Sequence, residues 1–188
     1  NPYATGTPTG RLNYWGYGAG YLFAPKASYT SGKEKEPERE FKDLVKEFHK
    51  NDIEVLVELY FTGEESAALA QEAVRFWVYE YHVDGVHLSG FAPAELLASD
   101  PLLADTKLLA GSWDGVPKTA AAPKLRERRW HLGEYNEGFL IDMRRVLKGD
   151  EDQVGRLIYQ TRRNPDAYGV INYMAATNGF TMMDMVSC

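Results

Sequence analysis

Two histidines and a serine stand close together in the segment 82–89, where they could do nucleophilic or metal chemistry. His87 and Ser89 are two residues apart on a predicted strand, so their side chains share one face. An imidazole there could take the proton of a hydroxyl, but no acid that would orient it is evident. His82 and His87 could ligate a metal, yet no spacing suggests a third ligand. We therefore expect neither a catalytic triad nor a metal site.

Three acidic residues lie in or beside predicted strands and are candidates for acid–base chemistry. Glu58 lies within the strand Ile53–Tyr60, and because buried acids are usually paired we interpret it as the partner of a helix lysine or arginine. Asp84 precedes a glycine in a turn that leads into a strand, which favours a structural role. Asp114 follows the strand Lys107–Ala110. We favour a role in the geometry of the loop there, and a contact with a ligand stays open.

Helices and strands alternate along the chain, and this order predicts parallel βαβ units. The first predicted element is a helix, because the apolar residues after Pro37 are spaced as on one face of a helix. The predicted strands are Ile53–Tyr60, Gly85–Leu88, Lys107–Ala110 and Gly169–Ala175. The predicted helices are Pro37–Lys50, one capped by Ser66, Pro93–Ala98, Gly138–Lys148, one from Asp150 to about Thr161 through a capping-box-like start, and one from Thr181, with Gly115–Arg128 as a loop. No glycine-rich nucleotide motif follows a strand, so we expect no cofactor.

Composition bounds the class of protein. The chain has 188 residues, of which 44% are hydrophobic and 26% charged, which suits a single domain over residues 1–188 with a substantial core. Residues 1–36 are expected to form an aromatic, loop-rich N-terminal segment. A net charge of -6 and a pI near 5.3 argue against nucleic acid as a partner.

Cysteine usage and hydropathy indicate which covalent links, membrane contacts and cellular location to expect. Cys188 is the single cysteine, which excludes an internal disulfide or a cysteine-based metal cluster. No apolar run approaches the roughly 20 residues of a membrane span, so no membrane partner is expected. Without a secretory apolar region we expect a cytoplasmic protein. Because the chain starts at Asn1, we interpret that start as a processed end, a cloning boundary or a piece of something longer.

Several short motifs occur in a fixed order. Four of them read VLVELYFT at 55–62, VDGVHLS at 83–89, KLLAGSWD at 107–114 and INYMAATNGFT at 171–181. NYWGY at 13–17, FAP at 23–25, PLLADTK at 101–107 and RRVLKGD at 144–150 accompany them. From about Asn13 to Val186 the chain resembles the α-amylase superfamily, glycoside hydrolase family 13, in its isoamylase, pullulanase and glycogen-debranching members.

The resemblance implies a (β/α)8 barrel with its active site at the carboxyl ends of the strands. Retaining glycosidases place two carboxyl groups roughly 5–5.5 Å apart, one as nucleophile and one as acid/base. The family nucleophile falls at Ser89, the acid/base at Gly111 and the third acid at Asn178. The family arginine beside the nucleophile falls at His87, and the histidine of the last motif falls at Thr177.

These replacements remove the chemistry that the family uses. Ser89 cannot attack an acetal carbon without an activating base, and Gly111 has no proton for a leaving oxygen. Asn178 can bond a hydroxyl but carries no charge. We therefore expect no catalytic residue in this chain. The resemblance leaves as candidate α-glucan or maltooligosaccharide contacts Trp15, Tyr17, His87, Trp113, Asp114 and Asn178.

The first motif and the chain length also depart from the family. The family Asp, Asn and His of that motif are taken to fall at Val57, Phe61 and Thr62, and by strand alternation Glu58 then faces away from the missing Asp. The connections are short, and the first two strands and the last strand of the barrel have no counterpart. We expect an α/β fold, a partial TIM-type (β/α) barrel of about five parallel strands with flanking helices, not a complete eight-stranded barrel.

Three functions stay open. The first is a catalytically degenerate, non-hydrolytic domain that binds α-glucan or is structural. The second is an active α-glucan hydrolase with acids such as Glu58, Asp84 or Asp114, and the third is a scaffold domain without sugar binding. An arc of strands leaves two open edges and an exposed apolar inner face. We favour covering by a homo-oligomer, or by segments of a longer chain, over covering by residues 11–25.

Overall fold

The computed structural model describes residues 17–18, 20–32, 36–113, 131–176 and 183–184. The predicted loop Gly115–Arg128 and most of the predicted helix from Thr181 lie outside the described residues. Within those residues, none of the helices has the length and apolar character needed to cross a membrane.

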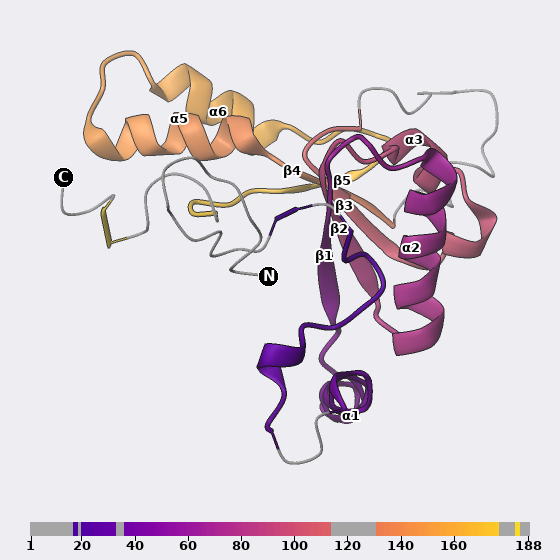
Figure 1. Ribbon diagram of the computed structural model, residues 1–188. Helices are drawn as coiled ribbons and strands as arrows, with labels where there is room; N and C mark the ends of the chain where they lie inside the picture. The colour runs from indigo at the N-terminus through magenta and orange to yellow at the C-terminus, as the bar shows by residue number, and fades with distance from the viewer. Residues whose placement is uncertain (1–16, 19, 33–35, 114–130, 177–182, 185–188) are drawn as a thin grey trace. The chain divides into compact units, whose positions relative to one another are not determined.

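Five parallel strands form one sheet whose strand order is the chain order (Figure 1). The strands are β1 Leu56–Phe61, β2 Gly85–Gly90, β3 Lys107–Ala110, β4 Leu132–Tyr135 and β5 Gly169–Ile171. This confirms the predicted α/β arrangement of about five parallel strands with flanking helices. In the described part of the chain the sheet has five strands, compared with the eight of a complete barrel.

The helices follow the predicted order, with small shifts at their ends. They are α1 Pro37–His49, α2 Ala67–Tyr81, α3 Ala94–Ala98, α5 Glu137–Lys148 and α6 Val154–Arg162, with short 3-10 turns at Ala27–Tyr29 and Pro101–Leu103. The predicted Ser66 cap is confirmed, because its hydroxyl accepts a hydrogen bond from the Leu69 N–H at 3.1 Å.

Three details of the predicted elements are wrong. The strand Leu132–Tyr135 was not predicted, and the last strand ends at Ile171 rather than Ala175. Helix α6 begins at Val154 without a side-chain cap, so the predicted start at Asp150 is also wrong. The chain turns through Gly149 and Asp152, both with positive φ, and this places Asp150 in the turn before α6.

The chain divides into two compact units, Asn1–Leu108 and Leu109–Cys188, and the division falls within β3. The interpretation of residues 1–188 as a single domain stays a prediction.

Strand alternation gives the sheet of the first unit two different faces. Side chains that are buried alternate with side chains that are partly open along both β1 and β2. The buried ones are Leu59, Phe61, Val86 and Leu88. The others are Glu58, Tyr60, His87 and Ser89. That open face combines polar groups with the exposed Leu56, and the predicted apolar inner face stays a prediction.

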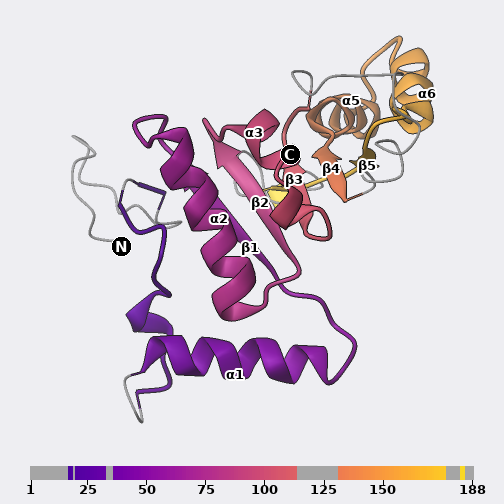
Figure 2. The same ribbon diagram turned by 90° about the vertical axis from the view of Figure 1, so that its right-hand side faces the viewer.

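Helix α2 lies along the strands of the first unit (Figures 1 and 2). Aromatic side chains of α1 and of the N-terminal segment pack against this helix. The Phe41 ring of α1 meets Trp77 and Tyr81 edge-on, at centroid distances of 5.5 and 5.3 Å. The Trp77 indole N–H donates to the Leu22 carbonyl at 2.7 Å. Trp77 and Tyr81 are buried, so this aromatic group belongs to the core of the unit.

A buried carboxylate ties α2 to the segment after α3. Asp100 accepts hydrogen bonds from the Arg75 guanidinium at 2.8 and 3.1 Å, from the Gln71 amide at 2.8 Å and from the Leu102 N–H at 3.0 Å. Burial alone would raise the pKa of Asp100, but these hydrogen bonds together lower it. The ionised carboxylate is thus fully partnered where it is buried.

In the second unit, polar pairs hold the helices and strands together. The Gln160 amide of α6 donates to Asp142 of α5 at 2.9 Å, and Gly138 leaves room for it, because a Cβ there would lie 2.5 Å from Gln160 Nε2. Glu134 of β4 is buried beside Arg163, with the closest N···O distance 2.6 Å. This ion pair offsets the cost of a carboxylate within the strand.

Gly90 is the position where the backbone requires glycine most strictly. It has φ +72°, and a Cβ there would lie 2.2 Å from the Phe61 carbonyl oxygen. We expect Gly90→Ala to lower the free energy of unfolding by about 3 kcal/mol, through strain and overlap together. The matched control is Gly149→Ala: its φ is +85° but a Cβ there meets no atom within 4 Å, so a loss of about 1 kcal/mol is expected. Urea denaturation of both variants is the measurement, and equal losses would contradict this account.

Candidate functional site

A polar cluster lies on the open face of β1 and β2. The parallel register pairs Glu58 with His87 and Tyr60 with Ser89, so all four side chains are on one face. Glu58 Oε1 lies 3.6 Å from His87 Nδ1. The Tyr17 hydroxyl donates to both carboxylate oxygens of Glu58, at 3.0 and 3.1 Å. The strands and the N-terminal segment together build this cluster.

The structure corrects the interpretation of Glu58. Its partners are Tyr17 and His87 rather than a helix lysine or arginine. It also shares the face of Ser89 instead of facing away from the catalytic positions, whereas Val57 is on the other parity of the strand. Glu58 is therefore an acid on the face of Ser89, and the assignment of the family Asp to Val57 stays a prediction.

Burial sets the charge state of His87. Removal from water lowers the pKa of His87 below its ordinary value, and the Glu58 carboxylate acts in the opposite direction without cancelling it. A neutral imidazole has one donor and one acceptor nitrogen. At neutral pH the cluster thus combines a carboxylate, an imidazole and a phenol, which suits hydrogen bonding to hydroxyl groups.

A hollow of about 220 Å³ lies against this cluster. Its lining includes Tyr17, Tyr21, Glu58 and Tyr60. The Tyr17 and Tyr60 rings are 5.0 Å apart between centroids, at 35° to one another. A larger hollow of about 500 Å³ shares Tyr21 and Glu58 with it. Aromatic walls with a few convergent polar groups are the ordinary make-up of a small-molecule site.

Asp84 has the structural role that was favoured for it. It lies directly before the amino end of β2, whereas Ser89 lies near the carboxyl end. Its carboxylate accepts from the Val55 N–H at 2.7 Å and lies 2.8 Å from His49 Nε2. These contacts fix the entry into β1 and β2. As for metals, the described residues contain no group of three or more His, Cys, Asp or Glu that could hold an ion.

Gly111 and Trp113 belong to the second unit, directly after β3. A Cβ at Gly111 would meet no atom within 4 Å, so packing does not demand glycine there. Trp113 is 1% exposed and its indole N–H donates to the Gly133 carbonyl at 2.9 Å. A ring so buried offers no face to a ligand, and the geometry does not favour its predicted contact with glucan. Trp15, Asp114 and Asn178 lie outside the described residues, as does Thr177.

Phe91 was missed by the sequence reasoning. It directly follows β2, two residues after Ser89, and is 76% exposed. The signal that could have found it was its place in the sequence, immediately beyond the motif that carries the nucleophile position.

Comparisons with known proteins agree with the motifs. No family model matches the chain. A glycogen debranching enzyme of Serratia proteamaculans (strain 568) is 27% identical over 244 aligned positions, which cover 95% of this chain and 36% of that enzyme. Isoamylase 3, chloroplastic, of Oryza sativa subsp. japonica is 26% identical over 94% of this chain and 32% of its own length. The chain thus spans about a third of the length of these curated relatives.

The fold has a counterpart among solved structures. Pullulanase type I from Bacillus subtilis str. 168, in complex with maltose, superposes with a TM-score of 0.65 over 92% of this chain and 34% of that one, at 17% identity. The class of protein is therefore an α/β domain of the barrel type. Within that class, the chain resembles the isoamylase, pullulanase and glycogen-debranching members of glycoside hydrolase family 13, as the motifs predicted.

The pKa shift of His87 gives a prediction with a definite sign. The folded state binds the His87 proton less tightly than the unfolded chain does, so the stability due to the neutral imidazole is lost as the pH falls below about 6.5. We expect His87→Gln to flatten the decline of unfolding free energy between about pH 7 and 5. Proton NMR should show His87 titrating below the ordinary value, and lower still in Glu58→Gln. A His87 titration at or above the ordinary value would contradict the prediction.

Proposed function

We propose that this chain is a catalytically degenerate relative of the α-glucan debranching enzymes, which binds α-glucan without hydrolysing it. One observation carries the proposal: the polar, aromatic hollow lined by Tyr17, Glu58 and Tyr60 lies on the strand pair that carries Ser89, to which the resemblance assigns the nucleophile position. The hollow is of the size of one sugar ring, and tyrosine faces pack well against the apolar faces of sugars. The maltose in the Bacillus pullulanase supports an α-linked glucan as the ligand.

The chemistry of the cluster supports binding over cleavage. A retaining mechanism needs two carboxyl groups about 5–5.5 Å apart, and β1 and β2 contribute one, Glu58. Tyr17 donates to both oxygens of that carboxylate, and a carboxylate held this way is a hydrogen-bond acceptor. Gly111 offers no proton for the leaving oxygen. General acid–base catalysis alone typically supplies about 10²–10⁴-fold, so its loss removes useful turnover.

One observation favours a second candidate, an active hydrolase that uses a non-standard acid. Glu58 is on the face of Ser89 and 3.6 Å from an imidazole nitrogen. In this alternative Glu58 acts as the acid or nucleophile. Among the described residues, β1 and β5 are the edge strands of the sheet, and we propose that a second copy or segments of a longer chain cover them, since unpaired strand edges invite pairing. We propose a cytoplasmic location, because the similar enzymes are named for glycogen.

Binding is tested with maltoheptaose by isothermal titration calorimetry. We expect saturable binding that weakens about tenfold or more in Tyr17→Ala and in Glu58→Ala, which remove an aromatic face and a hydrogen-bond acceptor. Tyr79→Ala is the matched control, because Tyr79 is half exposed on α2 and its hydroxyl donates to the Leu102 carbonyl. Cellohexaose serves as the control ligand. Absence of binding by the wild-type chain would overturn the proposal.

Hydrolysis is tested by release of reducing ends from glycogen, amylopectin and pullulan. We expect none from the wild-type chain, and none from Ser89→Asp, because Gly111 leaves the acid/base position empty in either protein. Saturable activity that disappears in Glu58→Gln would instead establish the second candidate. Tyr79→Ala is again the control, because the activity of a contaminating enzyme would be the same in the Glu58→Gln and Tyr79→Ala preparations.

A further inference from the structure

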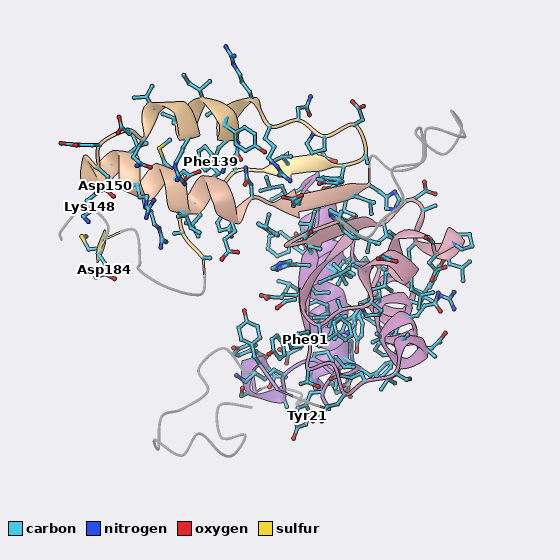
Figure 3. All side chains as sticks on the ribbon, turned by 90° about the horizontal axis from the view of Figure 1, so that it is seen from above. Tyr21, Phe91, Phe139, Lys148, Asp150 and Asp184 are labelled. Carbon is cyan, nitrogen blue, oxygen red and sulfur yellow. The ribbon has the colours of Figure 1, made fainter. Side chains whose placement is uncertain are left out.

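Phe91 is an exposed aromatic residue held at the carboxyl end of β2 (Figure 3). Exposure of single apolar side chains is common and needs no explanation by itself. What distinguishes Phe91 is its fixed geometry. Its N–H donates to the Phe61 carbonyl at 2.9 Å, so the register of β1 and β2 extends to this residue and sets where its side chain starts.

Two glycines make room for the ring in that position. Gly90 has φ +72° and no space for a Cβ, since one would lie 2.2 Å from the Phe61 carbonyl oxygen. Gly63, at φ +90°, lies under the ring: a Cβ there would be 3.2 Å from Phe91 Cβ and 3.4 Å from two ring carbons. The ring therefore rests on the Gly63 backbone and is exposed elsewhere. An aromatic group placed in advance loses little freedom when it binds.

The backbone directly before Phe91 adjoins the polar cluster. A Cβ on Gly90, the residue before it, would lie 3.1 Å from Tyr60 Cε2. The Tyr60 ring in turn lies 5.0 Å from that of Tyr17, and Ser89 is paired with Tyr60 in the register. The rings of Tyr17 and Tyr60 thus line the hollow beside Glu58, and Phe91 follows directly after the glycine that Tyr60 approaches, at the carboxyl end of β2.

We propose that Phe91 is a glucan-binding residue, which stacks on the glucosyl unit next to the one held by Tyr17 and Glu58. This inference rests on the proposed function and adds to it a second sugar position and the residue that recognises it. The apolar face of a pyranose suits the exposed phenyl ring, because stacking removes apolar area of both from water. It predicts that a single glucosyl unit binds weakly and that binding tightens when a second, linked unit is added.

The first test compares ligands and variants by calorimetry. Phe91→Ala is expected to weaken maltoheptaose binding about tenfold, and Phe91→Trp to retain it. Glucose should bind the wild-type chain and Phe91→Ala equally, since one unit reaches only the Tyr17 and Glu58 position. The matched control is Tyr159→Ala, which removes another exposed ring, on α6, and should leave the affinity unchanged. Circular dichroism melts show that each variant is folded.

The second test places a reporter at the site. The indole added in Phe91→Trp should shift its emission to shorter wavelength when maltoheptaose is added, because the sugar excludes water from it. The indole added in Tyr159→Trp should not respond. A wild-type chain that binds no glucan overturns both the proposed function and this inference. Binding by the wild-type chain that Phe91→Ala leaves undiminished, with no emission shift in Phe91→Trp, overturns this inference alone.

Discussion

The register between β1 and β2 is the constraint on which both the core and the candidate site depend. It places Leu59 and Leu88 among the buried side chains while Glu58 and His87 meet on the opposite face. Because side chains alternate with a period of two, a slip of one residue would bury the carboxylate and expose the leucines. The cost of such a slip fixes the register, and the fixed register brings residues from separate strands into one polar cluster.

Local signals in the sequence predicted the elements that depend on local physics. The spacing of apolar residues after Pro37 gave α1, and Ser66 gave the cap of α2. Strand β4 was missed because it contains Gly133 and Glu134, neither of which favours a strand. Glu134 is tolerated there because Arg163 reaches it. A partner that distant in sequence cannot be read from the strand itself.

The candidate site was also predicted only in part, because its contacts join residues that are distant in sequence. Tyr17 and His87 were named from motifs, and the structure brings both to Glu58. The partners of Glu58 were predicted wrongly because the general rule that buried acids are paired does not say which residue pairs with them, and Tyr17 and His87 reach Glu58 only through the fold. Trp113 was named for its place after β3, but its indole fills the core of the second unit. Motifs identify positions along a chain, whereas the direction of each side chain depends on pairing and packing.

Packing requires glycine at one position of this chain and not at another, and the difference bears on the acid/base that the resemblance assigns to Gly111. At Gly85 a Cβ would lie 2.5 Å from the Lys107 carbonyl oxygen, so packing demands glycine. At Gly111 a Cβ would meet nothing within 4 Å, so the fold would accept a side chain where the family has its acid. Packing therefore does not account for the missing acid. Meanwhile His87 stays partly buried although burial disfavours its charge. The fold thus keeps the polar cluster of β1 and β2 at a cost in burial, and it has room for a side chain at Gly111; both features are consistent with the proposed binding function.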